Sequence, residues 1–157
     1  MHKLIITSIF ITLFSTAPAV SDSHSGLQGT QQTDQQDQSA GEKRNSIIAA
    51  VVSDQLDAFS KDDGKRAFSH ASPTIKAYFK TPETFMRMVR TSYQMVYRPK
   101  SFELEAVMEL QDKVFQPVLF TDQKSQLYKV VYEMQQQEDE DWKINGVQVL
   151  RPKGIAI

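Results

Sequence analysis

The sequence predicts an α+β domain in which N-terminal helices pack on one face of a bent antiparallel sheet of four strands. Apolar residues recur at helical spacing from residue 46 to residue 98, and the spacing changes to strict alternation after Pro99. Helices followed by consecutive strands are typical of this architecture. With 157 residues, 40% apolar and 24% charged, the chain has the composition of one ordinary globular domain.

The N-terminus has the three-part pattern of a secretory signal peptide. His2 and Lys3 give a positive start, residues 4–14 form an apolar run, and Ala17-Pro18-Ala19 is a small-x-small cleavage site. A membrane-spanning helix needs about 20 apolar residues, so this run is too short. We expect residues 1–19 to be removed and the protein to be periplasmic or secreted, with no stable membrane anchor after cleavage. The alternatives are an uncleaved anchor or a buried strand.

Residues 20–42 are predicted to be a disordered linker. Gln, Ser, Asp, Gly and Thr dominate this stretch, and its only sizeable apolar residues are Val20 and Leu27. Such a composition cannot bury enough apolar surface to offset the entropy of an ordered chain. The predicted division is a signal peptide over residues 1–19, a linker over residues 20–42 and a single α+β domain over residues 43–157.

Four helices are expected at the start of the domain. The first covers residues 46–60, and its buried stripe is Ile48, Val51, Val52, Gln55, Leu56 and Phe59. A turn at residues 62–64 precedes a second, short helix over residues 65–71. Ser72-Pro73 and Thr81-Pro82 start the third and fourth helices, because Ser and Thr cap a helix and proline fits its first position. The fourth helix should end near Ser92.

Four strands are expected after Pro99, over residues 102–110, 114–121, 127–135 and 142–150. Pro117 lies inside the second strand, which requires an edge position or a bulge. In the last strand, Trp142 and Ile144 have the opposite parity to Val147 and Val149. A bulge of one residue at positions 145–146, where the glycine is favourable, would bring all four side chains to one face.

Several segments resemble a known bacterial family. They are QLDAF, DDGKRAFSHASPTI, YFKTPETFMRMVR, residues 93–98, the YEM of the third strand and the WKING of the fourth. Over residues 45–151 the chain resembles the family called domain of unknown function 4864. The resemblance implies a cone-shaped fold of the nuclear transport factor two-like (cystatin-like) class and no established activity. The chain departs from the family pattern at Val147, where a cysteine is usual, and at Gln94-Met95, where prolines are usual.

The composition excludes several kinds of chemistry. Cysteine is absent, which excludes disulfides, cysteine nucleophiles and cysteine-based zinc sites. The predicted domain contains one histidine, His70, too few for a zinc site, so neither a metal nor another cofactor is expected. The net charge of −1 argues against a nucleic-acid partner. Neither a G-x-S-x-G motif nor a glycine-rich phosphate loop occurs, and no catalytic residue is assigned.

Aromatic residues with polar tips indicate a pocket between the helices and the sheet. His70, Tyr93 and Tyr97 lie on the helical side, and Tyr128 and Tyr132 share one face of the third strand. Trp142 joins them if the bulge is present, and an arginine at the mouth could attract an anion. The predicted ligand-binding residues are His70, Tyr93, Tyr97, Tyr128, Tyr132, Trp142, Arg90 and Arg98. The alternative is a filled core in which each hydroxyl binds backbone.

These observations favour an exported, non-enzymatic binding or interaction module with a small-molecule ligand. One alternative is a structural homodimer that associates through the outer face of its sheet, where Phe115, Leu119, Leu127 and Val131 are expected. The other is a small-molecule enzyme with His70 as general acid or base, oriented by a partner such as Glu133. A structural histidine bonded to backbone is the simpler interpretation of His70.

Overall fold

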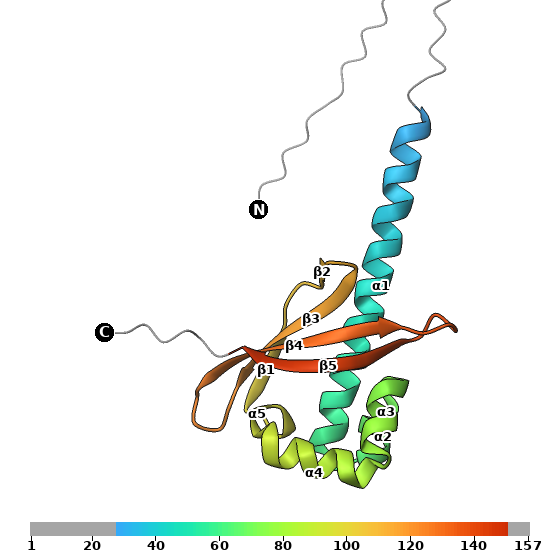
Figure 1. Cartoon of the computed structure of the whole chain (residues 1–157). Helices are drawn as coiled ribbons and strands as arrows, with labels where there is room; N and C mark the ends of the chain where they lie inside the picture. Colours follow the sequence, from blue (N-terminus) through green and yellow to red (C-terminus); the bar gives the residue numbers. More distant parts are fainter. Residues whose placement is uncertain (1–27, 151–157) are drawn as a thin grey trace, which may run out of the picture.

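The computed structural model describes residues 28–150, with side chains from residue 36 onward. Five helices precede five strands (Figure 1). The helices are α1 (Gln28–Ser60), α2 (Gly64–Ser69), α3 (Pro73–Phe79), α4 (Pro82–Ser92) and α5 (Gln94–Tyr97). The strands are β1 (Ser101–Leu104), β2 (Met108–Leu110), β3 (Lys113–Thr121), β4 (Leu127–Gln136) and β5 (Trp142–Leu150). The predicted signal peptide lies outside the described residues, as do residues 20–27 of the predicted linker.

Helix α1 is much longer than the sequence predicted. It begins at Gln28 rather than near Ser46, so residues 28–42 are helical and the predicted disorder is wrong for this part. The packed half of α1 supplies a nucleus, and adding further helical residues to a nucleus is easy for a stretch that is rich in glutamine and free of proline. The added half carries no apolar stripe and projects beyond the sheet (Figure 1).

The predicted starts of the second, third and fourth helices are confirmed. The side chain of Asp63 caps α2 by accepting from the Arg66 N–H. Ser72 and Thr81 cap α3 and α4 in the same way, each with proline at the first helical position. Helix α5 is a single additional turn that was not predicted.

The sheet is antiparallel, with the order β1-β3-β4-β5, and β2 also pairs with β3. The predicted first strand, residues 102–110, is therefore two strands separated by residues 105–107. Pro117 explains this interruption. Its carbonyl accepts from the Glu105 N–H at 3.0 Å, and the nitrogen of a strand residue points to the same side as its carbonyl. The missing N–H of Pro117 therefore faces the gap between β1 and β2. Pro117 cannot donate a hydrogen bond to that side, so the strand pairing is interrupted there.

The predicted bulge in β5 is confirmed. Glu133 pairs with Gly146 whereas Met134 pairs with Ile144, so Asn145 is the extra residue. Glycine is not needed for its conformational freedom, because no glycine in the described part of the chain has a positive φ. A Cβ on Gly146 would lie 3.6 Å from the Glu133 Cβ, an ordinary contact.

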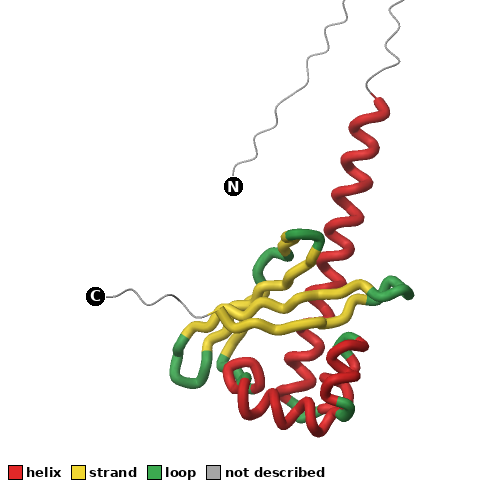
Figure 2. Tube along the Cα trace, viewed as in Figure 1, coloured by secondary structure: helices red, strands yellow, loops and turns green. Residues whose placement is uncertain are grey.

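The helices cover one face of the sheet (Figure 2). The core joins Ile48 and Val52 of α1 to the inward side chains of β3 and β4, which include the fully buried Val118, Phe120, Val130 and Tyr132. None of the helices in the described residues is long and apolar enough to span a membrane.

Candidate ligand cavity between the helices and the sheet

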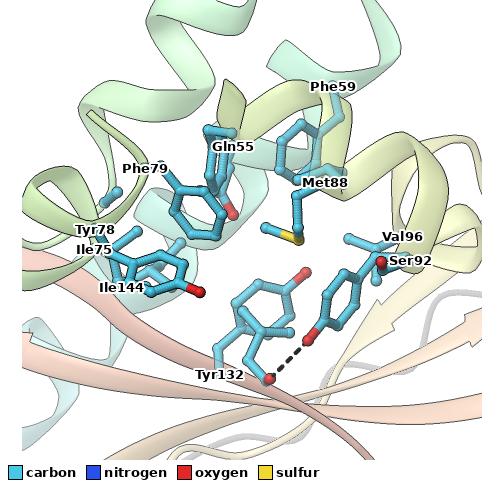
Figure 3. A pocket seen from close by; sticks show the side chains of 15 residues that line it. Gln55, Phe59, Ile75, Tyr78, Phe79, Met88, Ser92, Val96, Tyr132 and Ile144 are labelled. Carbon is cyan, nitrogen blue, oxygen red and sulfur yellow. Dashed lines mark hydrogen bonds between the residues drawn. The ribbon is translucent and has the colours of Figure 1, made fainter. Parts of the chain in front are cut away.

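A cavity of about 400 Å³ lies between α1, α3, α4 and the central part of the sheet (Figure 3). Most of its wall is aromatic or aliphatic. The lining residues are Gln55, Phe59, Ala71, Ile75, Tyr78, Phe79, Phe85, Met88, Val89, Ser92, Tyr93, Val96, Tyr132, Ile144 and Val147. A largely apolar cavity with a few inward polar groups is the usual form of a small-molecule site, and this volume is near the lower end of their range of about 300–1,000 Å³.

The bulge in β5 anchors the start of α3 at the edge of the cavity. The Ser72 N–H donates to the Ile144 carbonyl, and the Ile144 N–H donates to the His70 carbonyl, each at 2.8 Å. The buried Ser72 hydroxyl also donates to the Asn145 Oδ1 at 2.8 Å, and Asn145 is the residue that the bulge adds. The chain between α2 and α3 is therefore held against β5, which places Ala71 and Ile75 in the wall.

Tyr132 carries the most unusual polar group of the cavity. Its side chain is fully buried on β4, and its hydroxyl has no hydrogen-bond partner among the described residues. Figure 3 shows this hydroxyl directed into the open space rather than into the sheet. Burial raises the pKa of Tyr132 far above its ordinary value, so the phenol is protonated at any physiological pH and can donate a hydrogen bond.

Two other polar side chains of the wall have partners. The Tyr93 hydroxyl donates to the Val147 carbonyl at 3.4 Å. Gln55 is 2% exposed, and its Nε2 donates to the Ala67 carbonyl at 3.1 Å, so its amide oxygen is left toward the cavity. The residues that line the cavity include no Asp, Glu, Lys, Arg or His. The wall thus offers hydrogen bonds without charge.

Only two of the eight predicted ligand-binding residues, Tyr93 and Tyr132, line this cavity. Three others surround Asp62 on the outer surface. The Tyr97 hydroxyl donates to the Asp62 carboxylate, and the Nη2 atoms of Arg90 and Arg98 lie 2.9 and 2.6 Å from its oxygens. The hydrogen bond from Tyr97 and then that from Arg90 lower the pKa of Asp62. The prediction of arginines at the mouth of the cavity is wrong, because Asp62 draws them away.

His70 is also outside the cavity. It ends α2 and turns back toward α1, where its Nε2 lies 2.5 Å from the Asp54 Oδ2. Arg66 binds the same carboxylate, and these hydrogen bonds, that of Arg66 first, lower the pKa of Asp54 to about 2. The suggested partner Glu133 instead pairs with Lys113 at 3.1 Å. The hypothesis of His70 as an acid or base within the cavity is therefore not compatible with its position.

Tyr128 and Trp142 lie at the two ends of the sheet rather than at its centre. The Tyr128 hydroxyl donates to the Gln126 Oε1 at 2.9 Å. Tyr128 shares a face with Tyr132, as predicted, but the two lie four positions apart along the strand, a distance of about 13 Å. Trp142 is 7% exposed and borders a different, polar hollow beside Arg44. The prediction that six aromatic and histidine side chains converge is wrong for four of them.

The sequence analysis missed several lining residues, of which Gln55 is the most informative. It belongs to the buried stripe of α1 between aliphatic residues, and a polar residue inside an apolar stripe signals a buried hydrogen bond. Phe85, Met88 and Val89 recur at helical spacing along α4, but periodicity cannot distinguish a filled core from a cavity wall.

The comparisons with known proteins identify a family and no activity. No curated protein matches the sequence. The model of a family described as Domain of unknown function (DUF4864) matches residues 41–157, which is well over half of the chain and includes every residue that lines the cavity. The chain therefore belongs to the DUF4864 family.

Proposed function

We propose that the protein is an exported, non-enzymatic binding module that holds a small, mainly apolar ligand in the cavity between α3, α4 and the sheet. The observation that carries this proposal is the fully buried Tyr132 hydroxyl, which faces a space of about 400 Å³ without a hydrogen-bond partner among the described groups. A ligand oxygen or nitrogen in that space would complete its hydrogen bonding.

A buried hydroxyl without a partner destabilises a purely structural core. Leaving a buried polar group unpaired costs about 1–3 kcal/mol, and phenylalanine would fill the same position without that cost. Buried polar groups without partners are few in natural proteins, and each requires an explanation. A ligand that pairs with Tyr132 supplies one.

The proposal extends to the fold class and the compartment. A cavity enclosed by N-terminal helices and a bent antiparallel sheet is in keeping with the cone-shaped nuclear transport factor two-like class. The signal-peptide pattern of residues 1–19 supports export. Intact-mass measurement of periplasmic protein should give a chain that begins at Val20, and a mass that includes Met1 would exclude cleavage.

The binding test uses the neutral apolar fluorophore N-phenylnaphthylamine, whose emission rises in a dry site. We expect saturable, one-to-one binding to the full mature chain. Ser92 lies on the exposed rim of the cavity, so Ser92→Trp should block entry without disturbing the core. Arg87→Trp, on an exposed position of the same helix outside the lining, is the matched control. Equal binding by both variants would show that the dye does not enter this cavity, and no saturable binding by the wild type would contradict the proposal.

Self-association through the sheet is the second candidate function. Leu127 and Leu150 lie at the same end of the outer face and are 58% and 40% exposed. Exposed apolar residues gathered on one face indicate a protein interface. Val131 is only 9% exposed, so Leu127→Glu is the better test, with Gln126→Glu as its control. Sedimentation equilibrium at micromolar concentration should show a dimer that Leu127→Glu alone dissociates, and a wild-type monomer excludes this candidate.

A further inference from the structure

We infer that the ligand of this cavity is an uncharged carbonyl compound with an apolar ring system, whose carbonyl oxygen accepts a hydrogen bond from Tyr132. This inference rests on the proposed binding function and adds the chemical class of the ligand. It is carried by three features of the wall, namely the absence of charge in the lining, the one buried side-chain hydroxyl without a hydrogen-bond partner among the described residues, and the aromatic surface.

The lining excludes a charged ligand. None of the described residues around the cavity carries a charge at neutral pH, and Arg90 of α4 and Arg98 after α5 are paired with Asp62 on the outer surface. Moving an unpaired charge from water into an apolar environment costs many times more than the burial of a neutral polar group. A ligand that carries a carboxylate or an ammonium group would therefore bind weakly here, whereas a ligand with a neutral polar group would not be penalised in this way.

The hydrogen-bonding groups of the wall define the polar part of the ligand. Tyr93 donates its proton to Val147, and the Gln55 amide nitrogen donates to Ala67. Among the buried side chains of the wall this leaves the Tyr132 hydroxyl as the free donor. A free donor requires an acceptor on the ligand, and a carbonyl oxygen is a neutral acceptor that has no donor of its own to leave unpaired.

The remaining surface selects for an apolar ring. Phe85 is at the centre of an aromatic cluster, with ring centroids 6.1 Å from Phe59 and 5.6 Å from Phe79. All three rings line the cavity, and Figure 3 labels Phe59 and Phe79 in its wall. Aromatic walls of this kind favour flat or compact ring systems, which stack or meet ring edges at such distances.

The test compares three probes of nearly equal shape, namely methyl naphthyl ketone, its hydrocarbon isostere isopropenylnaphthalene, and naphthoate. Affinities are measured by displacement of N-phenylnaphthylamine from the full mature chain. We expect the ketone to bind about threefold to tenfold more tightly than the hydrocarbon, the effect of one net neutral hydrogen bond. Naphthoate should bind more than tenfold more weakly than the ketone because its charge is not matched.

Tyr132→Phe provides the decisive comparison, with Tyr128→Phe on the same strand as the matched control, since Tyr128 bonds Gln126 away from the cavity. Tyr132→Phe should fold, because it removes only an unpaired hydroxyl. This substitution should abolish the preference for the ketone over the hydrocarbon and leave the affinity for the hydrocarbon unchanged. The carbonyl carbon resonance of labelled ketone should move downfield on binding to wild type and to Tyr128→Phe, and not to Tyr132→Phe.

The possible outcomes separate this inference from the proposed function. If N-phenylnaphthylamine does not bind the cavity, the binding function itself fails. If the dye and both neutral probes bind with no preference for the ketone, or if the preference persists in Tyr132→Phe, the binding function stands and the carbonyl assignment is overturned. Tight binding of naphthoate would overturn the assignment of an uncharged ligand.

Discussion

Helices α3 and α4 begin in the same way and differ in what they bury. Each has a Ser or Thr cap whose side chain accepts a backbone N–H, followed by proline. Helix α4 has 11 residues and buries Phe85, Met86 and Val89. Helix α3 has seven residues and buries none, and its Tyr78 is 79% exposed. One helix is part of the core, and the other is a wall of the cavity.

A local start signal therefore determines where a helix begins and not how firmly it is held. Helix α3 is anchored at its first residue by Ser72 and ends in a strained turn. Lys80 has φ 64° and ψ −42°, and the Thr81 N–H donates to the Phe79 carbonyl at 2.7 Å across it. This is a γ-turn with positive central φ, a rare conformation that costs about 1–3 kcal/mol. We therefore expect α3 to open locally more easily than α4.

The largest expected difference between the two helices is in their aromatic residues. Phe85→Ala in α4 should lower the free energy of unfolding by about 3–5 kcal/mol, because it removes a buried ring that contacts three others. Phe79→Ala in α3 should lower it by less than half as much, since that ring is only half-buried. Urea denaturation measures both. Equal losses would show that α3 is held as firmly as α4.

Local chemistry explains why the fold could largely be predicted from the sequence. The caps at Ser72 and Thr81 and the parity change that demands a bulge near Asn145 act through neighbouring residues, so their patterns are visible in the chain. The division of the first strand opposite Pro117 depends on which side of β3 the proline nitrogen faces. That choice is made by the pairing of the whole sheet and has no local signal.

The site was less predictable, because it depends on which partner each polar side chain finds. Tyr93, Tyr97 and Tyr132 have the same chemistry, yet Tyr97 turns outward to Asp62 while Tyr132 is enclosed. Asp54 similarly attracts His70 from a distance of 16 residues along the chain. Such choices follow from tertiary geometry. Periodicity places a residue on a face, but it does not show whether that face meets a filled core or a cavity.

The next largest difference should be in how much the two helix caps contribute to stability, although they have the same motif. Thr81→Ala should lower the free energy of unfolding by about 1 kcal/mol, the usual value of an exposed cap. Ser72→Ala should lower it by about 2 kcal/mol, because the buried hydroxyl accepts from Ile75 and also donates to Asn145. Thermal unfolding of both variants, of Asn145→Ala and of the double variant Ser72→Ala with Asn145→Ala measures the coupling between Ser72 and Asn145. Additive effects of the double substitution would show that the link between α3 and the bulge contributes nothing.

The turn between the helices should respond in the opposite direction. Lys80→Gly should raise the free energy of unfolding by about 0.5–1 kcal/mol, because glycine relieves the strain of the positive φ. The greater conformational entropy of glycine in the unfolded chain offsets only part of this stabilisation. Ala77→Gly, at an exposed position inside α3, is the control and should lower stability by about 1 kcal/mol. If both glycines destabilise α3, the turn at Lys80 is not strained.

The smallest expected effect on stability is at Tyr78, and it separates the role of α3 as a wall from any role in the core. Tyr78 is mostly exposed, and its ring meets that of Phe79 edge to face at 4.9 Å between centroids. Tyr78→Ala should change the free energy of unfolding by no more than about 0.5 kcal/mol. Because Tyr78 covers one side of the cavity, the same change should raise the dissociation rate of N-phenylnaphthylamine severalfold in stopped-flow measurements. Arg87→Ala, on the exposed side of α4, should alter neither quantity. If Tyr78→Ala lowers the free energy of unfolding by several kcal/mol, Tyr78 belongs to the core. If the variant releases the dye at the wild-type rate, α3 does not close the cavity.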